Sequence, residues 1–127
     1  TFNQPLDTWD VSRVKNMYGT LKDARAFNQP LNSWEVDSVT NMRDMFGNAR
    51  AFNQSLTNWN VESVTDMGSL FRVTSAFDQD ISGWVTDNVK DMSYMFLNAT
   101  AFSAVDKSFV DNLYISVHLF AGIFCWG

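Results

Sequence analysis

Residues 27–51 read FNQPLNSWEVDSVTNMRDMFGNARA, and near copies of this stretch fill most of the chain. Phenylalanine returns every 25 residues, and tryptophan, glutamine, valine, methionine and alanine keep the same interval. No insertion or deletion breaks this register over four units. The regular interval predicts a repeat protein, in which each unit folds in the same way and stacks on the next.

The predicted units occupy residues 2–26, 27–51, 52–76 and 77–101, so residues 1–101 hold four regular repeats. Residues 102–127 follow the pattern poorly and form either a degenerate fifth repeat or an anomalous tail. Because one short unit cannot bury its apolar side chains alone, stacking predicts one continuous core. The predicted core columns are represented in the second unit by Phe27, Leu31, Trp34, Val39, Met42 and Phe46.

Two hydrophobic periods occur within one unit, and they predict two kinds of local structure. Side chains of alternating character in residues 27–31 are typical of a short extended strand. Val39, Met42 and Phe46 are spaced as on one face of a helix. Ser38 precedes this stripe and is expected to cap the start of the helix.

Residues 47–48, Gly-Asn, are expected to end that helix, because either residue accepts the left-handed conformation of a helix terminus. The predicted fold is therefore an α/β solenoid, a stack of 25-residue strand-turn-helix units with parallel strands. Pro5 and Pro30 lack the N–H that a parallel ladder uses, so the strands are expected to be short.

The composition is that of a folded, acidic protein. Of the 127 residues, 46% are hydrophobic and 18% are charged, and the formal net charge is −5. A nucleic-acid surface needs clustered Lys and Arg, so this charge argues against nucleic-acid binding and against electrostatic docking on an anionic membrane. Cys125 is the single cysteine, which excludes an intramolecular disulfide and a thiolate zinc site. No cofactor is expected.

Both ends of the chain carry further expectations. The first repeat starts at Phe2 with no signal peptide before it, which suggests an internal fragment of a longer protein. The apolar run of residues 115–126 is shorter than the about 20 residues that a membrane span needs, so no membrane insertion is expected. Because terminal caps usually have a polar outer face, residues 103–127 are either a degenerate unit or a reading-frame artefact.

Two runs carry a resemblance to a known family: FNQPLNSWEVDSVTNMRDMF at residues 27–46 and FDQDISGWVTDNVKDMSYMF at residues 77–96. They resemble the BspA-like leucine-rich repeat of bacterial surface proteins, also described as the PARCEL-type repeat. The resemblance covers residues 2–101 and implies a leucine-rich-repeat-like solenoid without catalytic activity. It also implies an extracellular or cell-surface protein that contacts a host, matrix or surface protein.

The tryptophan and glutamine columns each allow two interpretations. Four tryptophans at equal intervals could form a platform for sugar rings or extended peptides, but packing between neighbouring units is favoured, because the columns beside them are equally periodic and apolar. The glutamine column could contact a ligand, although a ladder in which each amide binds the next is favoured because buried amides must be satisfied. The two columns are Trp9, Trp34, Trp59 and Trp84, and Gln4, Gln29, Gln54 and Gln79.

The best candidate for a binding face is the outward side of the predicted strands. Polar side chains recur there in every unit, and solenoids commonly bind through such a face. The candidate residues are Asn3, Asn28, Asn53, Asp78, Ser55 and Asp80.

Catalytic and metal sites find little support in the sequence. His118 is the single histidine and lies in the anomalous tail, and no nucleotide-binding or hydrolase motif occurs. Asp78, Asp80, Asp87 and Asp91 lack the spacing of known calcium loops, so solvated acids are favoured there.

The predicted function is a non-catalytic protein-recognition or adhesion module. The alternatives are an intracellular scaffold and a glycan-binding module that uses the tryptophan column. An enzyme is not expected.

Overall fold

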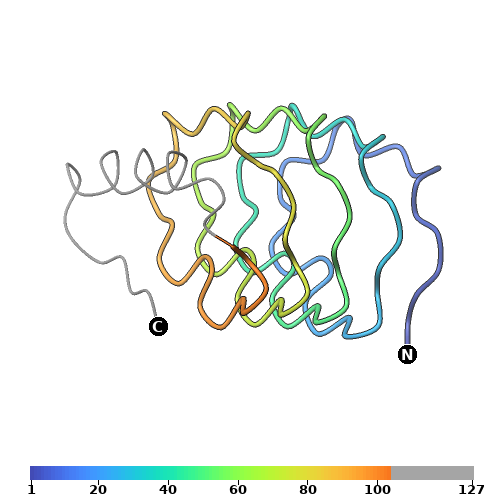
Figure 1. Cartoon of the computed structure of the whole chain (residues 1–127). Helices are drawn as coiled ribbons and strands as arrows, with labels where there is room; N and C mark the ends of the chain where they lie inside the picture. The colour runs from blue at the N-terminus through green and yellow to red at the C-terminus, as the bar shows by residue number, and fades with distance from the viewer. Residues whose placement is uncertain (104–127) are drawn as a thin grey trace.

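The computed structural model describes residues 1–103 and contains four stacked turns of chain, each one repeat long. We call them coil 1 (2–26), coil 2 (27–51), coil 3 (52–76) and coil 4 (77–101). The coils lie side by side, and the N-terminus lies at one end of the stack (Figure 1). Turn-rich stretches follow two opposite edges of the stack, and more extended stretches join them.

The predicted strand-turn-helix unit is wrong. Residues 1–103 contain no helix, and the only β pairing among them is isolated parallel bridges. The three bridges join Asn16 to Asn41, Asn41 to Asp66, and Asp66 to Asp91. The chain is therefore not an α/β solenoid, and its parallel pairing is limited to one position per coil.

Each coil is a succession of tight turns closed by hydrogen bonds between residues three apart. In coil 2, the Trp34 N–H donates to the Leu31 carbonyl at 3.0 Å, and the Val39 N–H donates to the Val36 carbonyl at 2.9 Å. The same two turns recur at equivalent positions in the other three coils. Tight turns at fixed places bend the chain back to the same position after every repeat.

The segment predicted as a helix is made of overlapping turns. A helix would direct every N–H along its own axis, to the carbonyl four residues earlier. Here the Asp44 N–H donates to Gly68 of the next coil at 2.9 Å, and the Phe46 N–H donates to Leu70 at 3.0 Å. Asp44 and Asn48 have positive φ angles of 56° and 60°, which no right-handed helix contains.

Positive φ recurs in two columns of this segment, one of them at Asp23, Asn48, Val73 and Asn98. Asn and Asp tolerate the left-handed conformation because their short polar side chains form local hydrogen bonds. Val73 is the exception, since a β-branched side chain clashes in this conformation. Its φ of 60° is imposed by the stack, in which the Val73 N–H donates to Leu97 of coil 4 at 2.7 Å.

We expect Val73→Asn to raise the free energy of unfolding by about 1 kcal/mol, because it removes left-handed strain at a half-exposed position. Chemical denaturation of the two proteins measures this difference. Asn98→Val, which creates the same strain at the equivalent position of coil 4, is the reciprocal control and should lower stability. A loss of stability in Val73→Asn would contradict the strain argument.

The core lies inside the coils and runs along the whole described stack. All six residues predicted to represent the core columns are buried, with Trp34 the most exposed of them at 3%. Phenylalanines of successive coils stack in parallel: the Phe27 and Phe52 rings are 6.0 Å apart and the Phe52 and Phe77 rings 6.1 Å. Each coil thus covers the aromatic side chains of the next, which holds the coils at a constant separation.

Within residues 1–103 the structure has no helix that is long and apolar enough to cross a membrane. The expectations for residues 104–127, including His118 and Cys125, lie outside the described residues.

Candidate recognition surface

The asparagines of the predicted binding face form hydrogen bonds between coils. The Oδ1 atom of Asn28 accepts the Asn53 N–H at 2.9 Å and the Gln54 Nε2–H at 3.1 Å. Asn3 accepts the equivalent two bonds from Asn28 and Gln29, and Asn53 accepts them from coil 4. We call this set of contacts the amide ladder. Its asparagine Oδ1 atoms already accept hydrogen bonds from the next coil, so they stabilise the fold.

Asp78 occupies the fourth position of the amide ladder and uses a carboxylate in the same way. Its Oδ1 atom accepts the Ser103 N–H at 3.0 Å and the Ser103 hydroxyl at 2.8 Å. The backbone hydrogen bond from Ser103, followed by the hydroxyl bond, lowers the pKa of Asp78 below its ordinary value. An acidic side chain therefore replaces asparagine here without loss of the coil-to-coil contact.

The glutamine column is internal to the stack, but its partners differ from those predicted. The Gln54 Nε2 atom donates to the Asn28 backbone carbonyl at 3.2 Å as well as to the Asn28 side chain. Gln29, Gln54 and Gln79 thus bind the asparagine of the preceding coil and not the next glutamine. The 25-residue interval places the asparagine and glutamine columns in register between coils. It does not show whether a glutamine side chain pairs with the neighbouring glutamine or with the neighbouring asparagine.

The outward position after each glutamine remains available to solvent. It holds Pro5, Pro30, Ser55 and Asp80 in the four coils, and all but the half-buried Ser55 are exposed. The Ser55 hydroxyl lies 3.1 Å from the Thr57 hydroxyl, and Asp80 accepts the Ser82 N–H at 2.9 Å. Of the predicted binding face, Ser55 and Asp80 thus belong to a column that the amide ladder does not use.

The tryptophan column is buried in three of the four coils. The Trp59 Nε1–H donates to the Leu31 carbonyl of the preceding coil at 2.9 Å, and its ring stacks on Trp34 at 6.4 Å. Trp34 and Trp84 make the same contact to the preceding coil. Trp9 belongs to coil 1, which has no described coil before it, and is 57% exposed.

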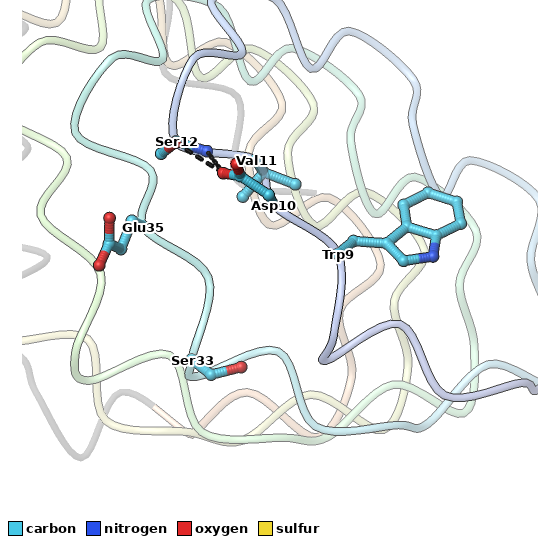
Figure 2. A pocket seen from close by; sticks show the side chains of 6 residues that line it. All are labelled: Trp9, Asp10, Val11, Ser12, Ser33 and Glu35. Carbon is cyan, nitrogen blue, oxygen red and sulfur yellow. Dashed lines mark hydrogen bonds between the residues drawn. The ribbon is translucent and has the colours of Figure 1, made fainter.

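A pocket of about 220 Å³ opens between coils 1 and 2 beside the tryptophan turns. Figure 2 shows the acidic side chains of Asp10 and Glu35 on neighbouring coils at this pocket, with Ser33 below them. The indole of Trp9 points away from the other labelled side chains (Figure 2). The pocket therefore offers carboxylates and hydroxyls, and this view gives no support to a sugar platform on Trp9.

The Asp10 carboxylate at this pocket is held in a defined position. It accepts the Ser12 hydroxyl at 2.6 Å and the Ser12 N–H at 3.0 Å, and the hydroxyl bond is the main cause of its lowered pKa. A second pocket of about 240 Å³ lies beside the tryptophan turn of coil 4 and includes Asp80 and Ser82. Both pockets lie beside tryptophan turns, and the second also includes Asp80 of the column that follows the glutamines.

Sequence reasoning missed a group of ion pairs that bridges coils. Arg43 of coil 2 donates to Asp91 of coil 4 at 2.8 Å and lies 3.6 Å from Asp66 of coil 3. Lys22 binds Asp44, whose other carboxylate oxygen is buried without a partner. Burial raises the pKa of Asp91, but hydrogen bonds from Ser93 and Arg43 outweigh it and the pKa is lowered.

The four acids considered for calcium do not form a metal site. Asp78 binds Ser103 in the amide ladder, whereas Asp91 pairs with Arg43. Among the described residues, no group of three or more His, Cys, Asp or Glu side chains is placed to hold a metal ion.

The fold and the amide ladder define a class of repeat protein: a stack of 25-residue coils built from tight turns and joined by side-chain amides. A family model described as "Mycoplasma protein of unknown function, DUF285" matches residues 1–71 and 34–121. The chain belongs to this family. No curated protein and no solved structure matches the chain.

The resemblance to BspA-like leucine-rich repeats is wrong as a family assignment, because the matching family is a different one. The absence of helices and regular strands from residues 1–103 also contradicts the leucine-rich-repeat solenoid that the resemblance implied. The shared Phe-Asn-Gln and Trp-x-Val motifs reflect the amide ladder and the tryptophan turn of this chain, and neither contact requires a strand-helix unit.

Proposed function

We propose that the chain is a non-catalytic protein-recognition module, displayed at a cell surface, that binds a partner protein through one side of the stack. We name this side the recognition face and define it by Pro30, Ser33, Glu35, Ser55 and Asp80. These residues follow the amide ladder or belong to the tryptophan turns and the adjoining pockets.

One observation carries the proposal: side chains that point inward are nearly constant between coils, whereas those on the recognition face differ. The buried column of Phe27, Phe52 and Phe77 does not change at all. The exposed column beside the tryptophans changes in every coil, and its members are Asp10, Glu35, Asn60 and Val85. A constant framework with changing outward side chains is how stacked repeats generate extended binding surfaces.

The framework also favours binding because it holds the recognition face rigid. The backbone beneath Pro30 and Ser55 is fixed by the amide ladder on one side and by the tryptophan turn on the other. Side chains presented by a fixed backbone lose little further entropy when a partner binds. Proline contributes to this rigidity because its φ angle is already restricted.

Binding to purified fibronectin, laminin and collagen, measured by biolayer interferometry, tests the proposal. We expect at least one of these proteins to bind the chain. Combined Pro30→Ala, Ser33→Ala and Glu35→Ala should weaken that binding at least about tenfold, which is typical when central interface residues are removed. All three residues are exposed, and within the described part of the chain their side chains make only one hydrogen bond, a surface bond from the Ser33 hydroxyl to the Asp7 carbonyl at 3.2 Å. Folding should therefore be unaffected.

The matched control replaces three exposed residues of the segments that end at the next phenylalanine, Arg25, Arg72 and Thr100, with alanine, and binding should not change. If both triple variants bind as well as the unmodified chain, the recognition face is wrongly placed. If no matrix protein binds and only an oligosaccharide panel does, the module recognises glycans. An intracellular scaffold would bind neither set.

A further inference from the structure

The stack carries a row of basic side chains along one edge. Arg25 and Arg50 occupy the same position in coils 1 and 2, and Arg72 lies three positions earlier in coil 3. All three are exposed, and none makes an ion pair within residues 1–103. Arg50 keeps one local hydrogen bond, from its Nε to Asn48 Oδ1 at 2.7 Å, which leaves its terminal nitrogens free. We call these residues the basic row.

A row of acidic side chains lies about half a coil away in the chain. Asp37, Glu62 and Asp87 occupy one equivalent position in coils 2, 3 and 4. All three are exposed, and the described part of the chain provides no ion-pair partner for them. We call these residues the acidic row.

The two rows lie on opposite sides of the coil cross-section. The acidic row belongs to the turns that close at Val39, Val64 and Val89, and the basic row to the segment that ends at the next phenylalanine. These two turn-rich stretches follow opposite edges of the stack (Figure 1). Among the described residues no ion pair joins the two rows.

The acidic row places one charge at the same position of three successive coils, so it has the period of the stack. In the basic row Arg25 and Arg50 keep this period, whereas Arg72 lies three positions earlier in its coil. That period is visible in the core, where equivalent rings of successive coils are 6.0 Å apart at Phe27–Phe52 and 6.4 Å at Trp34–Trp59. A second copy of the chain has the same period. Its acidic row therefore matches the basic row of the first copy in charge, and it matches the spacing of Arg25 and Arg50.

We propose that copies of this chain associate side by side, with the basic row of one copy against the acidic row of its neighbour. In a pair of copies, one copy still has an unused acidic row and the other an unused basic row. Further copies can therefore add at both ends, and the association is open-ended. A single exposed ion pair contributes little and is screened by salt. The association is therefore weak, cooperative along the row and sensitive to ionic strength.

Sedimentation velocity of the full chain over a range of protein concentrations tests this proposal. In about 20 mM NaCl, where screening is weak, the weight-average mass should rise with concentration. In about 500 mM NaCl it should equal that of the monomer. A monomer at every concentration in low salt would overturn the proposal.

Charge reversal identifies the surfaces. Combined Arg25→Glu, Arg50→Glu and Arg72→Glu should abolish association in low salt, and so should combined Asp37→Lys, Glu62→Lys and Asp87→Lys. Mixing these two triple variants should restore it, because each then meets an oppositely charged row. Association that survives in either variant alone would place the contact elsewhere.

The matched control is Arg13→Glu, Lys15→Glu and Lys90→Glu, which changes the net charge by the same amount as reversal of the basic row. It should associate as the unmodified chain does. Loss of association in this control would mean that net charge, and not matched rows, determines the behaviour. Circular dichroism of each variant excludes unfolding as the cause. This outcome is independent of matrix binding, which the recognition-face variants test separately.

Discussion

Phe52→Ala is expected to lower the free energy of unfolding by about 3–5 kcal/mol, the largest effect of any substitution considered for this chain. The Phe52 side chain is fully buried at the centre of the described stack. Its ring lies 4.3 Å from Phe46 of the preceding coil and stacks between Phe27 and Phe77. Removing it leaves a cavity between three rings and weakens both neighbouring interfaces.

Urea denaturation followed by circular dichroism measures this loss. Phe2→Ala is the matched control, because Phe2 occupies the same column in coil 1 but is 46% exposed and stacks on one ring only. It should cost clearly less than Phe52→Ala. Equal effects of the two substitutions would mean that the coils do not cover one another as described.

Asn28→Ala should lower the free energy of unfolding by about 1–3 kcal/mol, even though residue 28 belongs to the predicted binding face. The substitution removes the acceptor of the Asn53 N–H and of the Gln54 Nε2–H. Both donors are partly buried, so they would lose hydrogen bonds without full access to water.

Asn28→Asp provides a sharp control, because it keeps the Oδ1 acceptor at nearly the same size. Asp78 already performs this role in coil 4. The aspartate variant should therefore retain most of the stability that the alanine variant loses, as measured by thermal unfolding at neutral pH. If alanine and aspartate are tolerated equally, the amide ladder does not contribute to stability.

The repeat interval carried most of what could be predicted about packing. A constant spacing of 25 residues requires equivalent positions to repeat their environment, so Phe27, Trp34 and Met42 could be assigned to the core from the sequence. The interval does not specify the local backbone, because any conformation that repeats after 25 residues satisfies it.

The helix was predicted wrongly because hydrophobic spacing does not distinguish a helix from consecutive turns. Val39, Met42 and Phe46 face the core in either arrangement. The competing signal was a short polar residue or glycine at most of the positions that take positive φ, such as Asp44 and Asn48. The chain forms turns because alternate N–H groups can then donate to carbonyls of the next coil. In a helix the same N–H groups would bond to carbonyls of the helix itself.

The candidate surface was predicted only in part for a similar reason. Asn28 and Asn53 recur at outward-seeming positions, but their side-chain oxygens point along the stack to the next coil. A sequence shows that a polar residue repeats and does not show whether its partner is solvent or the neighbouring repeat. The ion pairs of Arg43 were missed because Asp91 lies two repeats away, where no local pattern connects them.

The central claim is that turns joined from coil to coil replace the expected helix. NMR couplings across hydrogen bonds test it most directly, because each coupling identifies the donor nitrogen and the acceptor carbonyl. The Asp44 nitrogen should couple to the Gly68 carbonyl, and the Phe46 nitrogen to the Leu70 carbonyl. A coupling from the Phe46 nitrogen to the Met42 carbonyl, as in an α-helix, would contradict the account.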